Sequence, residues 1–172
     1  MSLGVDVIIV RGAPGVGKSE AGSHVSMHFP AGAKVEVDVL RKMVISVDWT
    51  KQQEHVDLLQ IAAGVTADFL ELGFRPVIVV DTFSGDKVTG FLKKLREMRP
   101  GVGVELFGLY AAEEVLKSRM ASRPQGQFRK FDIARKLNAD LQRITDAQET
   151  RIDTSNLGPM EVAEIIVAKA NR

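Results

Sequence analysis

A glycine-rich segment near the amino end carries the residue types that bind phosphate. It runs Gly12-Ala13-Pro14-Gly15-Val16-Gly17-Lys18-Ser19, fits the pattern G-x-x-x-x-G-K-S, and follows the apolar run Val7–Val10. Glycines allow positive φ, so successive backbone N–H groups can surround a phosphate, and a helix that starts there adds its positive end. Lys18 could reach the β- and γ-phosphates, and the Ser19 hydroxyl could ligate Mg²⁺, which prefers oxygen. The segment therefore predicts a nucleoside-triphosphate site; the alternative is a glycine-rich turn that binds nothing.

Two carboxylates each follow an apolar run that predicts a buried strand. Asp38 comes directly after Val35–Val37, and Asp81 comes directly after Val77–Val80. In open α/β sheets ligands bind at the carboxyl ends of the strands, so both carboxylates are expected beside the phosphate-binding segment. Asp38 could deprotonate or position a hydroxyl that attacks the γ-phosphate. Asp81 could bind magnesium or substrate, and both assignments remain open.

Arg41 follows Asp38 by three residues and could hold an anionic or polyhydroxylated acceptor. The alternative for this pair is that Asp38 caps a helix over 39–47 and that Arg41 is solvated. The stretch 39–75 is expected to cover the acceptor side, with Asp48-Trp49-Thr50 as part of its rim. His55 lies in this stretch and is interpreted as a surface or core residue.

A basic segment occurs late in the chain. Residues 117–143 contain eight Lys or Arg against two Asp or Glu, whereas the formal net charge of the whole chain is only +1. Arg119 and Arg123 are four apart, so one helical turn places both on one face. Pro124-Gln125-Gly126-Gln127 then breaks the helix. The pattern of helix, break and helix over about 119–135 predicts a lid; the alternative is an exposed basic helix.

Strand and helix patterns alternate along the whole chain. This alternation predicts an α/β fold with a parallel sheet covered on both faces. Strands are expected at Val5–Val10, Lys34–Val37, Val77–Val80, Val102–Leu109 and Thr150–Ile152, and helices at Lys18–Phe29, Gln52–Leu72, Lys87–Met98, Ala111–Ser122, Asp132–Ile144 and Pro159–Ala170.

Length and composition limit the classes of function. The chain has 172 residues, 45% of them hydrophobic and 26% charged, and this mixture predicts one globular domain over 1–172. The absence of cysteine excludes disulfides and thiolate chemistry. The near-neutral charge argues against extended nucleic acids as partners. No apolar run is long enough to span a membrane, and no signal peptide is recognisable, so we expect a cytoplasmic protein without a membrane partner.

The segment Gly12–Ser19 resembles the phosphate loop of the P-loop nucleoside-triphosphate-binding proteins. The chain contains no Asn-Lys-x-Asp of the kind that reads guanine in GTPases. The strand-Asp-x-x-Arg pattern at Asp38 and Arg41 is similar to small-molecule kinases of the zeta-toxin, chloramphenicol-phosphotransferase and gluconate-kinase type. This resemblance implies a three-layer αβα sandwich with a five-stranded parallel sheet and a short helical lid. It also implies that Asp38 is the catalytic base and Arg41 a substrate contact.

The later segments resemble adenylate-kinase-like proteins. By that resemblance Arg119 stacks on adenine, and Arg123 clamps the transferring phosphoryl group. Residues 151–157, with a last strand followed by Asp-Thr-Ser, resemble the loop that lines the adenine pocket. Thr154 and Ser155 are therefore adenine contacts by resemblance only, and a simple turn explains their side chains almost as well.

Together these observations predict an ATP-dependent kinase that uses Mg²⁺ and transfers the γ-phosphoryl group to a hydroxyl of a small molecule. A kinase for a nucleotide or for the 5′ end of a nucleic acid is one alternative. A non-catalytic ATP-binding regulatory protein is another, because it needs the phosphate loop but not Asp38. The sequence does not identify the acceptor.

Overall fold

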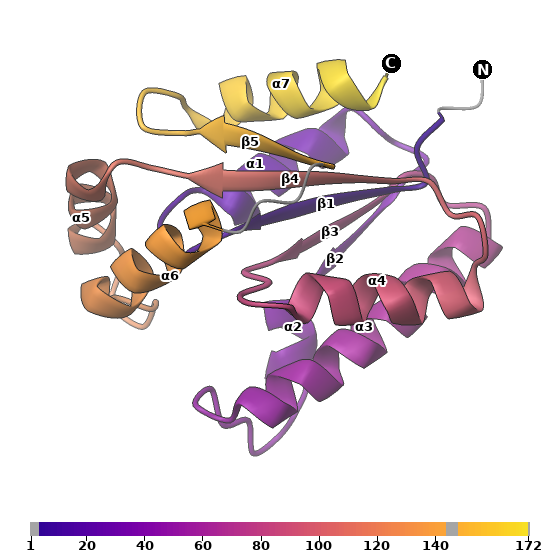
Figure 1. Cartoon of the computed structure of the whole chain (residues 1–172), viewed down its shortest axis with the longest axis horizontal. Helices are drawn as coiled ribbons and strands as arrows, with labels where there is room; N and C mark the ends of the chain where they lie inside the picture. The colour runs from indigo at the N-terminus through magenta and orange to yellow at the C-terminus, as the bar shows by residue number, and fades with distance from the viewer. Residues whose placement is uncertain (1–3, 144–147, 172) are drawn as a thin grey trace.

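A computed structural model of the chain describes residues 4–143 and 148–171. Strands and helices alternate throughout this part (Figure 1). In chain order the elements are β1 (Val7–Gly12), α1 (Lys18–Met27), β2 (Ala33–Glu36), α2 (Val37–Lys42), α3 (Gln52–Glu71), β3 (Val77–Asp81), α4 (Lys87–Met98), β4 (Val104–Tyr110), α5 (Glu113–Ala121), α6 (Phe131–Arg143), β5 (Glu149–Asp153) and α7 (Pro159–Ala170).

The five strands form one parallel sheet in the order β2-β3-β1-β4-β5. β1 lies in the middle, where Val7 pairs with Val77 of β3 and with Val104 of β4. Parallel pairing brings the carboxyl ends of all five strands to one edge of the sheet. The predicted five-stranded parallel sheet is therefore confirmed.

Alternate residues of the strands supply two separate hydrophobic cores. Ile8 and Val10 of β1 pack on one face with residues of α1 and α7. Val7 and Ile9 pack on the other face with residues of α3 and α4. Figure 1 shows the same division, with α1 and α7 on one side of the sheet and α3 and α4 on the other. Each fully buried aliphatic side chain contributes about 1.5–3 kcal/mol, which makes these cores the main stabilising contacts of the three layers.

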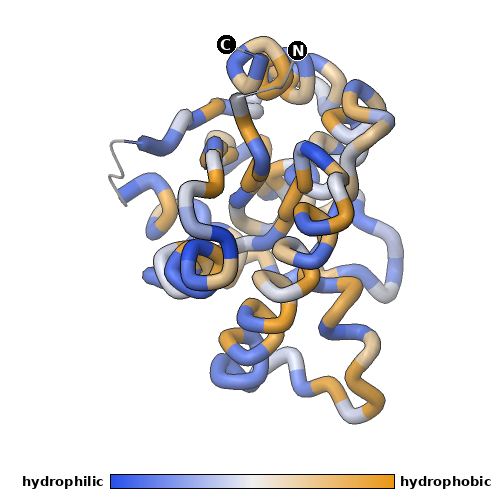
Figure 2. Tube along the Cα trace, turned by 90° about the vertical axis from the view of Figure 1, so that its right-hand side faces the viewer, coloured by the Kyte–Doolittle hydropathy of each residue, from blue (hydrophilic) through white to orange (hydrophobic). Residues whose placement is uncertain are grey.

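The outer helices are amphipathic. On α4 the buried residues Val88, Phe91 and Leu95 recur at helical spacing, and most of the remaining residues are partly or fully exposed. Figure 2 shows such alternation as changes between orange and blue along the outer helices. Among the described residues, no helix has the length and apolarity to cross a bilayer.

The observed elements lie close to the predicted ones. The helices Lys87–Met98 and Pro159–Ala170 have the predicted bounds, and most of the other ends differ by one or two residues. Ile144, the predicted end of the sixth helix, lies outside the described residues.

A buried ion pair joins β1 to β5 across β4. Arg11 donates from Nε to Glu149 Oε1 at 2.6 Å and from Nη2 to Glu149 Oε2 at 2.7 Å. The two side chains are only 1% and 2% exposed. Gly108 of β4 lies between them, and a side chain there would overlap the Glu149 carboxylate. This two-pronged pair connects the central strand to the edge strand β5.

We predict that Glu149→Ala lowers the free energy of unfolding by about 3–5 kcal/mol, because it leaves the buried Arg11 guanidinium without its counter-ion. Urea unfolding followed by circular dichroism measures this change. Asp140→Ala is the matched control, since it removes the exposed ion pair with Arg143, and it should change stability by less than about 1 kcal/mol. Equal effects of the two substitutions would contradict the prediction.

Candidate functional site

The glycine-rich segment connects the carboxyl end of β1 to the first turn of α1. Gly15 and Gly17 both have a φ of 92°, in the left-handed region that glycine adopts without strain. Gly17 is the N-cap of α1, and no described side chain hydrogen-bonds to the amides at this helix end. These amides therefore remain available to an anion at the helix N-terminus, as a phosphate loop requires.

The loop packs tightly against its neighbours. A Cβ atom on Gly15 would lie 2.9 Å from Leu116 Cδ1 and 2.9 Å from Met120 Sδ, both on α5. A Cβ on Gly12 would lie 2.8 Å from the backbone oxygen of Leu109 in β4. Packing alone therefore requires that both of these residues be glycine.

Several charged groups on this edge of the sheet act on Lys18. Burial lowers the pKa of its ammonium group, the carboxylates of Asp38 and Asp81 raise that pKa, and the Arg123 guanidinium lowers it. These electrostatic effects require that all three side chains lie near Lys18. The structure thus brings together the predicted residues from the start of α2, the end of β3, the phosphate loop and the predicted lid segment. Ser19 is exposed at the same helix start.

Asp38 lies in the first turn of α2, which begins at Val37 directly after β2. The N-cap of this helix is Glu36, and the helix ends at Lys42. The alternative in which Asp38 caps a helix over 39–47 is therefore wrong, because strand β2 passes into the helix without an intervening loop. Asp38 is exposed, so its carboxylate is accessible for a ligand.

Arg41 is only 6% exposed, so the alternative of a solvated Arg41 is also wrong. Its guanidinium lies 4.4 Å from the ring centre of Trp49, and Nη2 donates to the Asp48 backbone oxygen at 3.4 Å. Glu54 Oε1 is 4.0 Å from the same nitrogen. Arg41 Nε is buried and has no hydrogen-bond partner among the described residues. The aromatic ring and Glu54 offset the burial of this charge.

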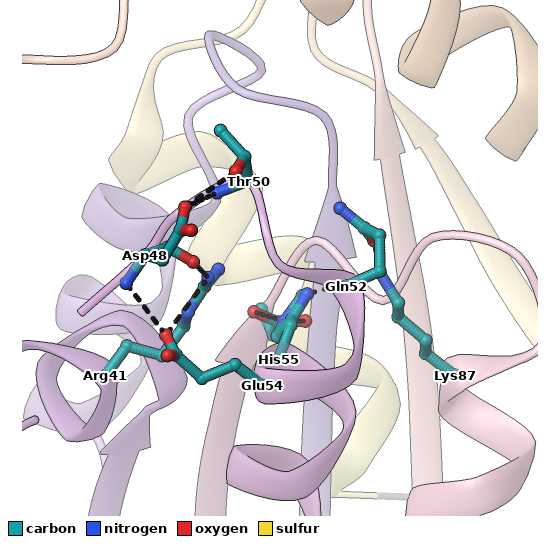
Figure 3. Close-up of polar contacts among 8 residues, drawn as sticks. Arg41, Asp48, Thr50, Gln52, Glu54, His55 and Lys87 are labelled. Carbon is teal, nitrogen blue, oxygen red and sulfur yellow. Dashed lines mark hydrogen bonds and ion pairs between the residues drawn. The ribbon is translucent and has the colours of Figure 1, made fainter. Parts of the chain in front are cut away.

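A short loop, residues 48–50, covers this arginine (Figure 3). The Asp48 carboxylate accepts hydrogen bonds from the Thr50 backbone N–H at 2.9 Å and from the Thr50 hydroxyl at 2.6 Å, and these bonds lower the pKa of Asp48. The Asp48 N–H donates to Glu54 Oε1 at 3.2 Å. The predicted rim at 48–50 is therefore a hydrogen-bonded turn attached to the start of α3.

Asp81 ends β3 and is 4% exposed. It accepts a hydrogen bond from the Phe83 backbone N–H at 2.8 Å, and His55 Nε2 lies 3.1 Å from each of its carboxylate oxygens. Lys87 Nζ lies 3.2 Å from the other ring nitrogen of His55, and burial lowers the pKa of Lys87. Figure 3 shows His55 between the Arg41 group and Lys87.

Sequence reasoning missed the contact between His55 and Asp81. A usable indication was present, because His55, Leu58, Leu59 and Ala62 follow the spacing of one buried helix face. A histidine on such a face needs a buried polar partner.

The arginines of the predicted lid make contacts with backbone oxygens. Arg119 donates from Nη2 to the Thr154 backbone oxygen at 2.6 Å and from Nη1 to the Thr154 hydroxyl at 3.0 Å. Arg123 donates from Nη1 to the Phe128 oxygen at 2.7 Å, and Arg129 donates to the Ala121 oxygen at 2.9 Å. The segment between α5 and α6 is thus a hydrogen-bonded loop beside the phosphate loop. The roles of Arg119 and Arg123 toward a nucleotide stay predictions.

The side chains of Thr154 and Ser155 are engaged within the protein. Thr154 is 1% exposed, and its hydroxyl lies 3.0 Å from the Val16 oxygen of the phosphate loop. The Ser155 hydroxyl donates to Asp153 Oδ1 at 2.6 Å and accepts from the Ala112 N–H. The bonds from Ser155 lower the pKa of Asp153. These contacts are those of a turn that supports the loop, and adenine contact by either residue stays a prediction.

Comparison with known proteins identifies the fold. No protein-family model matches the sequence, and no curated protein sequence matches it. Solved structures do match. The tunicamycin resistance protein of Deinococcus radiodurans is 24% identical with a TM-score of 0.71, and the alignment covers 96% of this chain and 95% of that one.

Two kinases are similar over comparable lengths. A gluconokinase from Sinorhizobium meliloti 1021 is 23% identical with a TM-score of 0.65, over 95% of this chain and 90% of that one. The APS kinase of Mycobacterium tuberculosis, in complex with AMPPNP and APS, is 14% identical with a TM-score of 0.70, over 95% and 96%. The chain therefore shares the fold of these proteins, which is the α/β fold with a five-stranded parallel sheet that the sequence predicted.

Proposed function

We propose that this protein is an ATP-dependent kinase that transfers the γ-phosphoryl group to a hydroxyl of a small molecule. The proposal rests on the placement of Asp38 and Asp81 at the strand ends that flank the phosphate loop, where both carboxylates and Arg123 act on the pKa of Lys18. Phosphoryl transfer needs positioned cations, a group that orients the nucleophile and little covalent chemistry, and this set of residues supplies them.

Residues 12–19 would bind the triphosphate through backbone amides, with Lys18 on the β- and γ-phosphates. The oxygen donors next to Lys18 fit magnesium, namely the exposed Ser19 hydroxyl and the Asp81 carboxylate. Magnesium bound there would neutralise charge on the phosphates. Arg119 and residues 154–155 would line the nucleotide base.

Asp38 would act on the acceptor. Its exposed carboxylate would accept the proton of the acceptor hydroxyl while that oxygen forms a bond to the γ-phosphorus. The bond between the γ-phosphorus and the β,γ-bridging oxygen breaks in the same transfer, and ADP leaves. Arg123 would stabilise the charge on the transferring group. Arg41, three residues after Asp38 in α2, is the proposed acceptor contact.

The similar structures support this assignment. They include a gluconokinase and a sugar kinase, and the APS kinase binds AMPPNP together with APS on the same fold. These similarities support the proposed reaction class.

An acceptor screen tests the proposal. The full chain with Mg²⁺ and ATP is incubated with sugars, sugar acids, nucleosides, nucleotides and aminoglycosides, and ADP release is measured. We expect one class to accelerate ADP release well above the rate with water alone. ATP binding without turnover on any acceptor would favour the regulatory alternative.

We predict that Gly17→Ala weakens binding of Mg·ATP by about 5–30-fold, because alanine resists the positive φ by about 1–2 kcal/mol and lets the empty loop relax. Gly15→Ala should weaken binding further, since its Cβ also meets Leu116 and Met120. Titration calorimetry measures both. Gly64→Ala is the matched control on α3, where a Cβ meets no atom within 4 Å, and it should leave the affinity unchanged.

We predict that Asp38→Asn lowers phosphorylation of the acceptor by at least about 100-fold while the affinity for Mg·ATP changes less than twofold. The amide keeps the shape of the side chain but cannot take the proton. Single-turnover assays and calorimetry separate the two effects. Asp68→Asn, at an exposed position of α3, is the control. Normal phosphorylation by the Asp38 variant would refute its role as base.

A further inference from the structure

Asp81, His55 and Lys87 form a hydrogen-bonded array, and the proposed reaction gives a role to Asp81 but none to His55 or Lys87. It joins three elements, the end of β3, the first turns of α3 and the start of α4. The side chains of His55 and Asp81 are 9% and 3% exposed. Burying an unpaired carboxylate at a strand end is unfavourable, and the imidazole of His55 supplies a hydrogen-bond partner for it.

The contacts fix the tautomer of His55. The Lys87 ammonium can only donate, so at 3.2 Å it requires Nδ1 to be an acceptor. A neutral imidazole carries one N–H, which must then be on Nε2. That N–H points between the two oxygens of Asp81, each 3.1 Å away. Lys87 itself is held by Gln52 Oε1 at 2.7 Å and by Ser84 Oγ at 3.1 Å.

These donors fix Asp81 in one orientation. Oδ2 accepts from Phe83 N–H as well as from His55, whereas Oδ1 faces only the imidazole among the described residues. Lone pairs of the carboxylate therefore remain for one further donor or ligand. The ammonium of Lys18 is the neighbouring charge on the phosphate-loop side.

We infer that His55 is a positioning residue that aims the Asp81 carboxylate at the magnesium of the bound nucleotide, and that Lys87 holds His55 in the required tautomer. The inference rests on the proposed function, because it assumes that a magnesium nucleotide occupies the phosphate loop. The inference gives α3, which lies in the stretch expected to cover the acceptor, a role in orienting a magnesium ligand. Histidine to carboxylate contacts of this kind orient metal-binding groups in proteins and change affinity by about 10–100-fold when removed.

The first experiment compares two substitutions of His55. Gln places an N–H donor close to the position of Nε2, whereas Leu has similar bulk and no donor. Binding of AMPPNP is measured calorimetrically with Mg²⁺ and with EDTA. We expect His55→Leu to remove about 10–100-fold of the gain in affinity that Mg²⁺ provides, and to leave binding in EDTA unchanged. His55→Gln should retain most of the gain.

A double-mutant cycle with Asp81→Asn tests whether His55 acts through Asp81. His55→Leu should have little further effect on the magnesium-dependent gain once Asp81 is replaced. Lys87→Met should reduce the gain less than His55→Leu does. Lys93→Met, on the exposed side of the same helix, is the matched control and should match the unmodified protein. Circular dichroism checks that each variant is folded.

Three outcomes overturn the inference: a full magnesium-dependent gain in His55→Leu, equal losses in the Gln and Leu variants, or an undiminished effect of His55→Leu in the Asp81→Asn background. Failure of the unmodified protein to bind AMPPNP in either buffer would instead contradict the proposed function. In that case ¹⁵N NMR of the His55 ring still tests the array. A tautomer with the proton on Nδ1 and none on Nε2 would overturn the inference.

Discussion

The parallel pairing of β1 with both β3 and β4 is the constraint on which the candidate site depends. The strand that carries the phosphate loop lies in the middle of the sheet, so the carboxyl ends of its neighbouring strands lie beside that loop. β3 delivers Asp81, and β2, one strand further out, delivers Asp38. On the other side Thr154, which directly follows β5, contacts Arg119. Strand order alone therefore assembles side chains that are far apart in the sequence, and the two cores fix the helices that cover them.

Polar contacts at the strand ends keep this arrangement in one state. The hydrophobic cores hold the layers together, but apolar packing is non-directional and does not orient charged groups. Arg11 pairs with Glu149 and also donates to the Phe83 oxygen, which follows Asp81. The Thr154 hydroxyl contacts the phosphate loop directly. Arg11, Asp81 and Thr154 each hydrogen-bond to a partner on another element, so the same bonds orient the site residues and hold the elements together.

Local patterns in the sequence predicted the strands, most helices and the phosphate loop, because glycine conformation, hydrophobic periodicity and chain order are local properties. The contacts of long side chains could not be predicted in this way. The burial of Arg41 under Trp49 depends on how the loop at 48–50 folds back, and the pairing of His55 with Asp81 depends on how α3 crosses β3. Both are set by tertiary packing, where a residue's partner is far away in the sequence.

The absence of a side chain at Gly15 has a mechanical consequence. Leu116 and Met120 occupy the space that a side chain would fill, so this part of α5 rests directly on the phosphate loop. Arg119 ties the same turn to Thr154. The helix is thus braced at two points, against the phosphate loop and against the residue that follows β5. A change in side-chain size at Leu116 or Met120 would therefore press directly on the loop.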